Sequence, residues 1–185
     1  DAYKTQQRER IAYKGKNLAL GLESTIFMCP DCGRIGTLHS RGSHLFCECG
    51  FDAIYDEYGE LTDKKENKYT VTRLDYMQQE KLIQMLQAGE GVESPLFSDK
   101  VTLSEIDADH NLTSVKEGEM AAYIDRIECC GKVFSYQEMQ GMAIYSRNAI
   151  ILHENGNKNH FEIKADQAFC ALKYLYLYQM KEKVN

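Results

Sequence analysis

The alternation of apolar and polar residues changes along the chain, and each pattern predicts a different element. Between residues 72 and 88, apolar positions recur every three or four residues, which predicts an amphipathic helix. Its expected buried stripe is Leu74, Met77, Lys81, Leu82, Met85 and Leu86. Thr72 and Asp75 resemble an N-terminal cap, Gly89 follows the last turn, and Pro95 prevents the helix from resuming.

From residue 99 onward, the helical spacing gives way to short alternating runs separated by glycine and asparagine. Such runs predict antiparallel strands joined by hairpins. The expected strands are 101–106, 112–115, 119–127, 132–135, 142–145, 149–153 and 159–163. The clearest hairpin turn is expected at 154–159, with the sequence ENGNKN.

A second helix is predicted over 165–183, at the end of the chain. The residues expected on its buried stripe are Ala168, Phe169, Leu172, Leu175, Tyr176 and Gln179. Seven short strands followed by one helix resemble the layout of a pleckstrin-homology-like (PH-like) barrel, in which the helix closes one open end. A sheet with a helix on one face fits the pattern equally well, so the predicted class is α+β with an antiparallel barrel or sheet.

Four cysteines provide the strongest chemical signal in the sequence. They form two close pairs, each followed by a glycine: Cys29, Cys32, Cys47 and Cys49. The spacing Cys-x2-Cys-x14-Cys-x1-Cys is that of a zinc ribbon with one residue fewer in the second pair. Thiolates bind Zn²⁺ tetrahedrally, and the glycines allow backbone amides to approach the sulfurs. We therefore expect a structural zinc site with no open coordination position.

Other interpretations of the same residues stay open at this point. His39 or His44 can replace one of the thiolates as a ligand, and iron can replace zinc. The four cysteines can also be small buried residues or a disulfide pair. The remaining cysteines, Cys129, Cys130 and Cys170, are expected to be free thiols.

Length, composition and charge restrict the setting. The 185 residues suffice for one large or two small domains, and no apolar run is long enough for a membrane-spanning helix. An odd number of cysteines, with four in metal spacing, fits a reducing cytoplasm better than a disulfide framework. After residue 50, fifteen basic residues face twenty-three acidic ones, which argues against a nucleic-acid surface.

The order of these parts divides the chain into four predicted regions. Residues 1–25 are expected to connect to an upstream domain that this chain lacks, with a short helix over 17–24. Residues 26–60 form the predicted zinc ribbon, and within them 51–61 suit a strand or turn that leaves the second cysteine pair. Residues 61–98 are a linker with the amphipathic helix, and 99–185 are the strand-rich module with its C-terminal helix.

A family resemblance rests on the order of several segments. YKGKNLALGLE runs into CPDCG and CECGF, followed by DEYGEL, a YMQQEK helix and a strand-rich end. This order resembles the C-terminal extension of bacterial phospholipid/glycerol acyltransferase family proteins. The resemblance implies an upstream domain that transfers an acyl group from a thioester to lysophosphatidate, with a His-x-x-x-x-Asp motif.

No histidine of this chain is followed by aspartate at the spacing of that motif, so no catalytic residue is carried over. We expect a non-catalytic accessory region that contacts the upstream acyltransferase domain, and as further contacts a membrane surface or an acyl carrier. In the parent protein it would lie in the cytoplasm or at the inner membrane face. The alternative is a free-standing zinc-ribbon adaptor that binds protein or nucleic acid.

Overall fold

The computed structural model describes residues 2–109, 111–156, 160–165 and 169–180. The chain separates into two compact units, Asp1–Gln78 and Gln79–Asn185. Unit 1 contains helix α1 (Ala2–Glu9), a 3₁₀ turn η1 (Leu22–Ser24) and one sheet. The short helix expected over 17–24 is reduced to this single turn.

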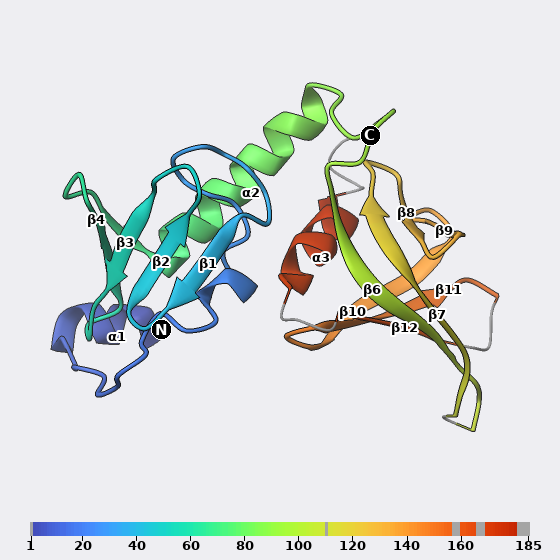
Figure 1. Cartoon of the computed structure of the whole chain (residues 1–185), viewed down its shortest axis with the longest axis horizontal. Coiled ribbons are helices and arrows are strands. Elements are labelled where there is room, and N and C mark those ends of the chain that lie inside the picture. Colours follow the sequence, from blue (N-terminus) through green and yellow to red (C-terminus); the bar gives the residue numbers. More distant parts are fainter. Residues whose placement is uncertain (1, 110, 157–159, 166–168, 181–185) are drawn as a thin grey trace. The chain divides into compact units, whose positions relative to one another are not determined.

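The sheet of unit 1 has five antiparallel strands in sequence order (Figure 1). These are β1 (Leu38–Arg41), β2 (His44–Cys47), β3 (Asp52–Tyr55), β4 (Glu60–Asp63) and β5 (Lys68–Thr70). The segment expected to be a strand or turn after the second cysteine pair is the hairpin of β3 and β4. Strand β5 was not predicted, because KYT has only three residues and follows a run of charged ones.

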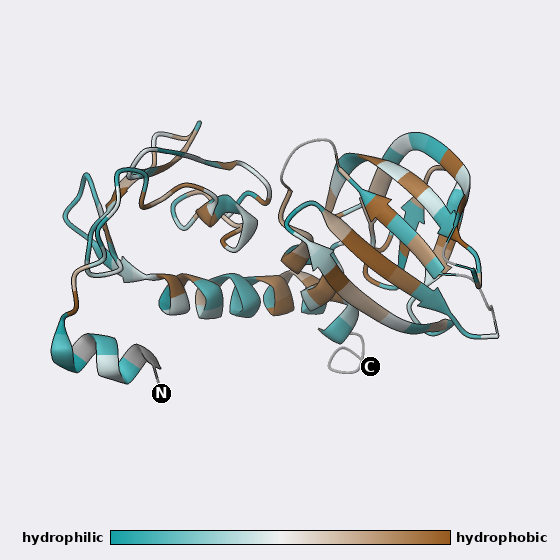
Figure 2. Ribbon diagram, turned by 90° about the horizontal axis from the view of Figure 1, so that it is seen from below, coloured by the Kyte–Doolittle hydropathy of each residue, from teal (hydrophilic) through white to brown (hydrophobic). Residues whose placement is uncertain are grey.

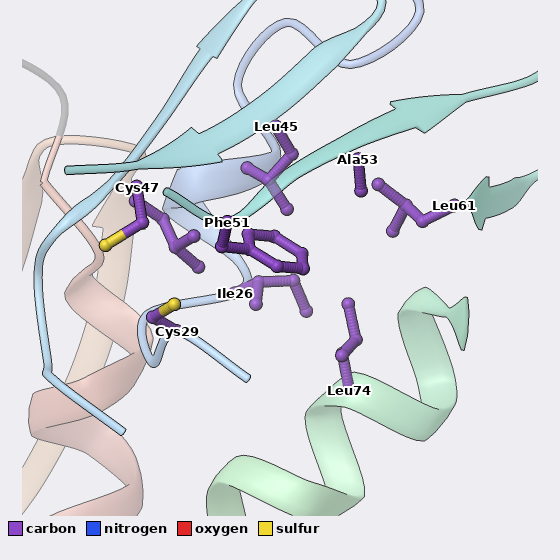
Figure 3. Close-up of a cluster of buried hydrophobic side chains, with 9 residues drawn as sticks. Ile26, Cys29, Leu45, Cys47, Phe51, Ala53, Leu61 and Leu74 are labelled. Atoms are coloured by element: carbon purple, nitrogen blue, oxygen red, sulfur yellow. The ribbon is translucent and has the colours of Figure 1, made fainter. Parts of the chain in front are cut away.

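A small apolar cluster fills one face of this sheet (Figure 3). Its buried members are Ile26, Cys29, Leu38, Leu45, Cys47, Phe51, Ala53, Leu61 and Leu74. Two of the nine are cysteines of the predicted metal site. The metal site and the hydrophobic core of unit 1 are therefore parts of the same packed region.

Helix α2 (Val71–Gln87) confirms the predicted amphipathic helix. Its most buried positions are Leu74, Gln78, Leu82 and Leu86, whereas Met77, expected on the same stripe, is 37% exposed. The predicted cap is wrong by two residues: the Arg73 N–H donates to Thr70 Oγ1 at 3.1 Å, so Thr70 caps the helix instead of Thr72. The sequence alone did not decide between Thr70 and Thr72 as the cap, because both are threonines at the start of the helix and only Val71 separates them.

Among the described residues, unit 2 contains seven strands, the predicted number, as one antiparallel sheet that curls into a half-barrel, followed by helix α3 (Ala171–Met180). The strands are β6 (Phe97–Ile106), β7 (Leu112–Ala122), β8 (Arg126–Cys129), β9 (Lys132–Ser135), β10 (Met139–Ser146), β11 (Ala149–Glu154) and β12 (His160–Lys164). Their order across the sheet is β10-β11-β12-β6-β7-β8-β9. The chain is thus α+β, with two antiparallel sheets, a C-terminal helix and a cysteine cluster.

The strand boundaries differ from the prediction at two places: the expected strand 119–127 is interrupted at 123–125, where the chain turns from β7 into β8, and the expected break at 116–118 is absent. The sequence suggested a break between two strands there, but Gly118 lies inside the long strand β7, in register with Val101. A Cβ at Gly118 would lie 3.1 Å from the Cys130 Sγ, so the glycine admits a close neighbour and does not end the strand. The expected turn at 154–159 falls partly on 157–159, outside the described residues.

The buried face of helix α3 is not the predicted stripe. Figure 2 shows the alternation of apolar and polar residues along the strands of the half-barrel. Helix α3 has apolar residues at both its buried and its half-buried positions. The buried residues are Ala171, Lys173, Tyr174, Leu177 and Met180, while Leu172, Leu175 and Tyr176 are half-buried and Gln179 is exposed. Phe169 is buried ahead of the helix, and Ala168 lies outside the described residues.

A buried ion pair explains this rotation of the helix. Lys173 Nζ lies 2.7 Å from Asp99 Oδ2 on β6, and the Tyr174 hydroxyl donates to the same oxygen at 2.6 Å. Lys173 was not among the residues expected on the buried stripe, yet its side chain is only 3% exposed. A charged residue that is buried by pairing cannot be recognised from hydrophobic periodicity alone.

Candidate metal centre

The first cysteine pair lies in a tight loop ahead of β1. The Cys29 N–H donates to the Arg34 carbonyl at 3.0 Å, and the Gly33 N–H donates to the Cys29 carbonyl at 2.9 Å. Gly33 has φ 70°, a conformation that glycine adopts without a steric penalty. This loop brings the side chains of Cys29 and Cys32 to the same side.

The second pair occupies the turn between β2 and β3. The Cys47 N–H donates to the Phe51 carbonyl at 2.9 Å, and the Gly50 N–H donates to the Cys47 carbonyl at 3.0 Å. Gly50 has φ 101°, which allows the chain to turn within the shortened Cys-x-Cys spacing. The missing residue of the second pair is therefore absorbed by a tighter turn.

The two loops bring all four sulfurs together. Cys29 Sγ lies 3.6 Å from Cys49 Sγ, and Cys32 Sγ lies 3.9 Å from Cys47 Sγ. All four Sγ atoms lie within 4.8 Å of one another. A tetrahedral ion with Zn–S bonds of about 2.3 Å requires sulfurs about 3.8 Å apart. The four cysteines therefore match the size of a tetrahedral metal site.

The cluster lies at the boundary between core and solvent. Cys29 and Cys47 are buried, and Figure 3 shows their sulfurs beside the apolar cluster of unit 1. Cys32 and Cys49 are exposed. One ligand of each pair thus belongs to the core and the other to the surface, so an ion bound to all four would join the two loops to the sheet.

The electrostatics of the four thiols differ strongly. Burial raises the pKa of Cys29 far above its usual range, although the backbone N–H groups of Cys32 and Asp31 act in the opposite direction. At Cys32, burial also acts to raise the pKa, but hydrogen bonds from the Arg34 side chain and backbone dominate and lower it to about 6. A lowered pKa favours the thiolate form of Cys32, which is the form of cysteine that binds metal ions.

Neither histidine that was considered as a substitute ligand belongs to the sulfur cluster. His44 Nδ1 is hydrogen-bonded to Asp52 Oδ1 at 2.8 Å, and the His39 ring packs against Phe46 with centroids 5.8 Å apart. A disulfide pair does not describe the site either, because all seven cysteines are free and the sulfurs are much farther apart than the roughly 2.05 Å of a disulfide.

Two residues near the sulfurs were not identified from the sequence. The Arg34 side chain is hydrogen-bonded to Cys32, and the Cys47 thiol donates to Thr37 Oγ1 at 3.3 Å. The position of Arg34, two residues after the first pair, is a usable signal, since a cation there can interact with the thiolates. Nothing in the sequence singles out Thr37.

A second group of carboxylates, Glu105, Asp107 and Asp109, lies close in sequence to His110, at the end of β6 and in the turn that follows it. The Asp107 carboxylate accepts the backbone N–H groups of Asp109 and Asn111, each at 2.9 Å. This arrangement is an ordinary Asx-type turn between β6 and β7. His110 lies outside the described residues.

Comparison with protein-family models gives no match to this chain, and comparison with curated proteins gives none either. Within the described part of the chain, no helix combines the length and apolar character that crossing a membrane requires.

Proposed function

We propose that the four cysteines form a structural zinc site and that unit 1 is a zinc ribbon. The observation that carries this proposal is the mutual distance of the sulfurs, all within 4.8 Å. Four thiolates complete a tetrahedral coordination sphere and leave no position for substrate, so the ion would stabilise the fold and take no part in catalysis. Zinc is favoured over iron because it needs no redox partner in a structural role.

The small core of unit 1 supports a structural role for the ion. Strands of three or four residues bury little apolar surface, and domains of this size are often stabilised by metals. Cys29 and Cys47 lie within the core itself. An ion held there would add stability where apolar burial is limited.

Metal content tests the proposal directly. We expect about one zinc ion per chain after purification without added metal, measured by elemental analysis together with a thiol assay. Cys47→Ser should lose the ion and the ordered fold of unit 1, whereas Cys170→Ser, a buried cysteine in unit 2, should retain both. Retention of a full equivalent of zinc by Cys47→Ser, with unchanged melting, would exclude a four-cysteine structural site.

For the chain as a whole, we propose a non-catalytic accessory role in which unit 2 is an interaction module of PH-like layout. The seven-strand half-barrel followed by α3 supports that layout. The link to a phospholipid/glycerol acyltransferase rests on the resemblance alone. An in-frame upstream domain with His-x-x-x-x-Asp in the source gene would support it, and a gene without such a domain would remove it.

The alternative, a free-standing adaptor that binds nucleic acid, has weaker support. A hollow of about 320 Å³ beside the cysteine cluster is lined by Arg41, His44, Phe46 and Lys64 among others. However, Asp52 already pairs with His44 at 2.8 Å and with Lys64 at 3.1 Å. Two of these three basic groups are thus partly neutralised, which weakens attraction for phosphates.

A further inference from the structure

Part of strand β7 lacks a neighbour on one side among the described strands. β6 pairs with β7 over almost its whole length, but on the other side β8 pairs only with residues 120–122. One further bond follows, from the Cys130 N–H to the Glu119 carbonyl at 3.0 Å. Between 114 and 118, no described strand covers this side of β7, and Figure 1 shows β6 and β7 continuing together beyond β8 and β9.

The direction of the backbone groups follows from two hydrogen bonds. The Ala122 carbonyl accepts the Leu96 N–H at 2.8 Å on the β6 side, whereas the Glu119 carbonyl faces β8. Because backbone groups of alternate residues point to the same side of a strand, Val115 and Glu117 present their N–H and C=O groups to the open side. Four strong hydrogen-bonding groups therefore point to this side in a row. Cys130, in the turn after β8, lies beside them, with its Sγ 3.5 Å from the Lys116 carbonyl.

The side chains around this edge include exposed apolar ones. Leu112 is 57% exposed and Val115 is 61% exposed. They lie opposite Ile106 and Ser104 of β6, which are two residues apart and therefore share one face of the sheet. The step in register between these pairs is a bulge at Thr113, which ends the regular edge.

We propose that the open side of β7 between Ser114 and Gly118 binds an extended peptide segment of another protein as an added antiparallel strand. Main-chain bonds to Val115 and Glu117 would hold the segment, and its side chains would set specificity. The complementary segment carries a basic residue opposite Glu117, an acidic residue opposite Lys116 and a β-branched apolar residue opposite Val115. This proposal lies outside the proposed zinc function, since β7 belongs to unit 2.

A second copy of this chain fits the edge less well than a peptide. If Val115 bonds to Glu117 of a second copy, the two-fold symmetry places Lys116 directly opposite Lys116. If Val115 lies opposite Val115, Glu117 faces the bulged Thr113. Like charges opposite each other weaken strand pairing, and a bulge interrupts the ladder. The adjacent charges on β7 thus act against self-association while they specify a complementary partner.

A designed peptide tests the proposal on the full, zinc-loaded chain. The probe is fluorescein-labelled Ser-Arg-Glu-Val-Thr-Ile, which places Arg, Glu and Val opposite Glu117, Lys116 and Val115. We expect saturable binding by fluorescence anisotropy and amide shifts at 114–118 by NMR. N-methylation of the peptide Val blocks a bond to β7 and should weaken binding by at least about tenfold, whereas N-methylation of the peptide Glu, whose N–H points away, should be tolerated.

Variants of the protein provide matched controls. Glu117→Lys should weaken binding by about tenfold, and a peptide with Glu in place of Arg should restore it. Val115→Pro removes an N–H that faces away from β6, so the fold should persist while binding is lost. Ile144→Lys on β10, the strand at one end of the sheet, should bind like the wild type.

Three results would overturn the proposal. The first is the absence of saturable binding to the folded wild type at millimolar peptide. The second is equal binding of the two N-methylated peptides, which would show that no strand ladder forms. The third is a concentration-dependent dimer, detected by light scattering and abolished by Val115→Pro, which would make the occupant a second copy.

Discussion

The two units are stabilised by different means although both are antiparallel. Unit 1 has strands of three or four residues, and two of the nine buried residues in its core cluster are cysteines. Unit 2 has strands of up to eleven residues and an interior of aromatic pairs, such as Phe134 with Phe161 at 5.2 Å and Phe97 with Tyr174 at 4.9 Å. The core cluster of unit 1 thus includes two of the four clustered cysteines, whereas the interior of unit 2 is built largely from aromatic pairs.

The comparison shows how each unit fixes a unique arrangement. In unit 2, Asp99 receives both Lys173 and the Tyr174 hydroxyl, and this pair determines which face of α3 is buried. In unit 1, no comparable buried ion pair occurs among the described residues, and the cysteine cluster joins the loops instead. The cysteine cluster and the ion pair thus play corresponding roles in the two units.

Removal of the proposed metal ion should have the largest effect and should separate the two units most clearly. Structural zinc sites contribute on the order of 10 kcal/mol or more to folding. We therefore expect a chelator to collapse the dispersed NMR amide signals of residues 26–70 while those of unit 2 persist. Acidification should have the same selective effect, because protons compete with the ion for the thiolates. Equal loss of signals from both units would contradict the division of roles.

Lys173→Met tests the corresponding feature of unit 2. It leaves the Asp99 carboxylate with the Tyr174 hydroxyl but without its cation, and we expect a loss of about 2 to 3 kcal/mol of stability in unit 2 by denaturant unfolding. The zinc content should not change. Lys100→Met, at an exposed position on the same β6 strand, serves as the matched control and should cost less than about 0.5 kcal/mol.

The smallest effect is expected at Gln78, which connects α2 to unit 1. Its side-chain oxygen accepts the Phe27 N–H at 2.9 Å, and its amide donates to the Thr25 carbonyl at 3.0 Å. Gln78→Ala leaves the buried Phe27 N–H without this acceptor and should cost about 1 to 2 kcal/mol in unit 1. Gln87→Ala, exposed on the same helix, should have no measurable effect on thermal unfolding.

Most of the fold could be predicted because the residue spacing within a short segment determines whether that segment forms a helix, a strand or a tight turn. The hairpins of unit 2, helix α2 and the four cysteines all follow from spacing within short segments. The prediction was wrong where the structure of a segment depends on contacts with residues that are far away in the sequence. The buried face of α3 depends on Asp99, which lies more than seventy positions earlier. Similarly, the long strand through Gly118 depends on Val101, its register partner.

The candidate site shows the same division. The clustering of the four cysteines was predicted because two tight turns impose a fixed spacing. Thr37 and the partner of His44 are recognised only when β1, β2 and β3 are assembled. The open side of β7 was also invisible in the sequence. It exists because β8 is shorter than its neighbour, a property of strand pairing and not of composition.

The continuity of helix α2 has a consequence for the life of the protein in the cell. The division between the units falls between Gln78 and Gln79, inside a seventeen-residue helix and not in a loop. Proteases cleave extended, exposed chain, and a helix anchored by Leu74 in the core of unit 1 offers them little. If the proposed zinc ion were lost, the contact of Leu74 with the core of unit 1 would weaken, and proteases could then cleave the chain at the junction between the units. Metal supply would then govern how long the two units remain one molecule.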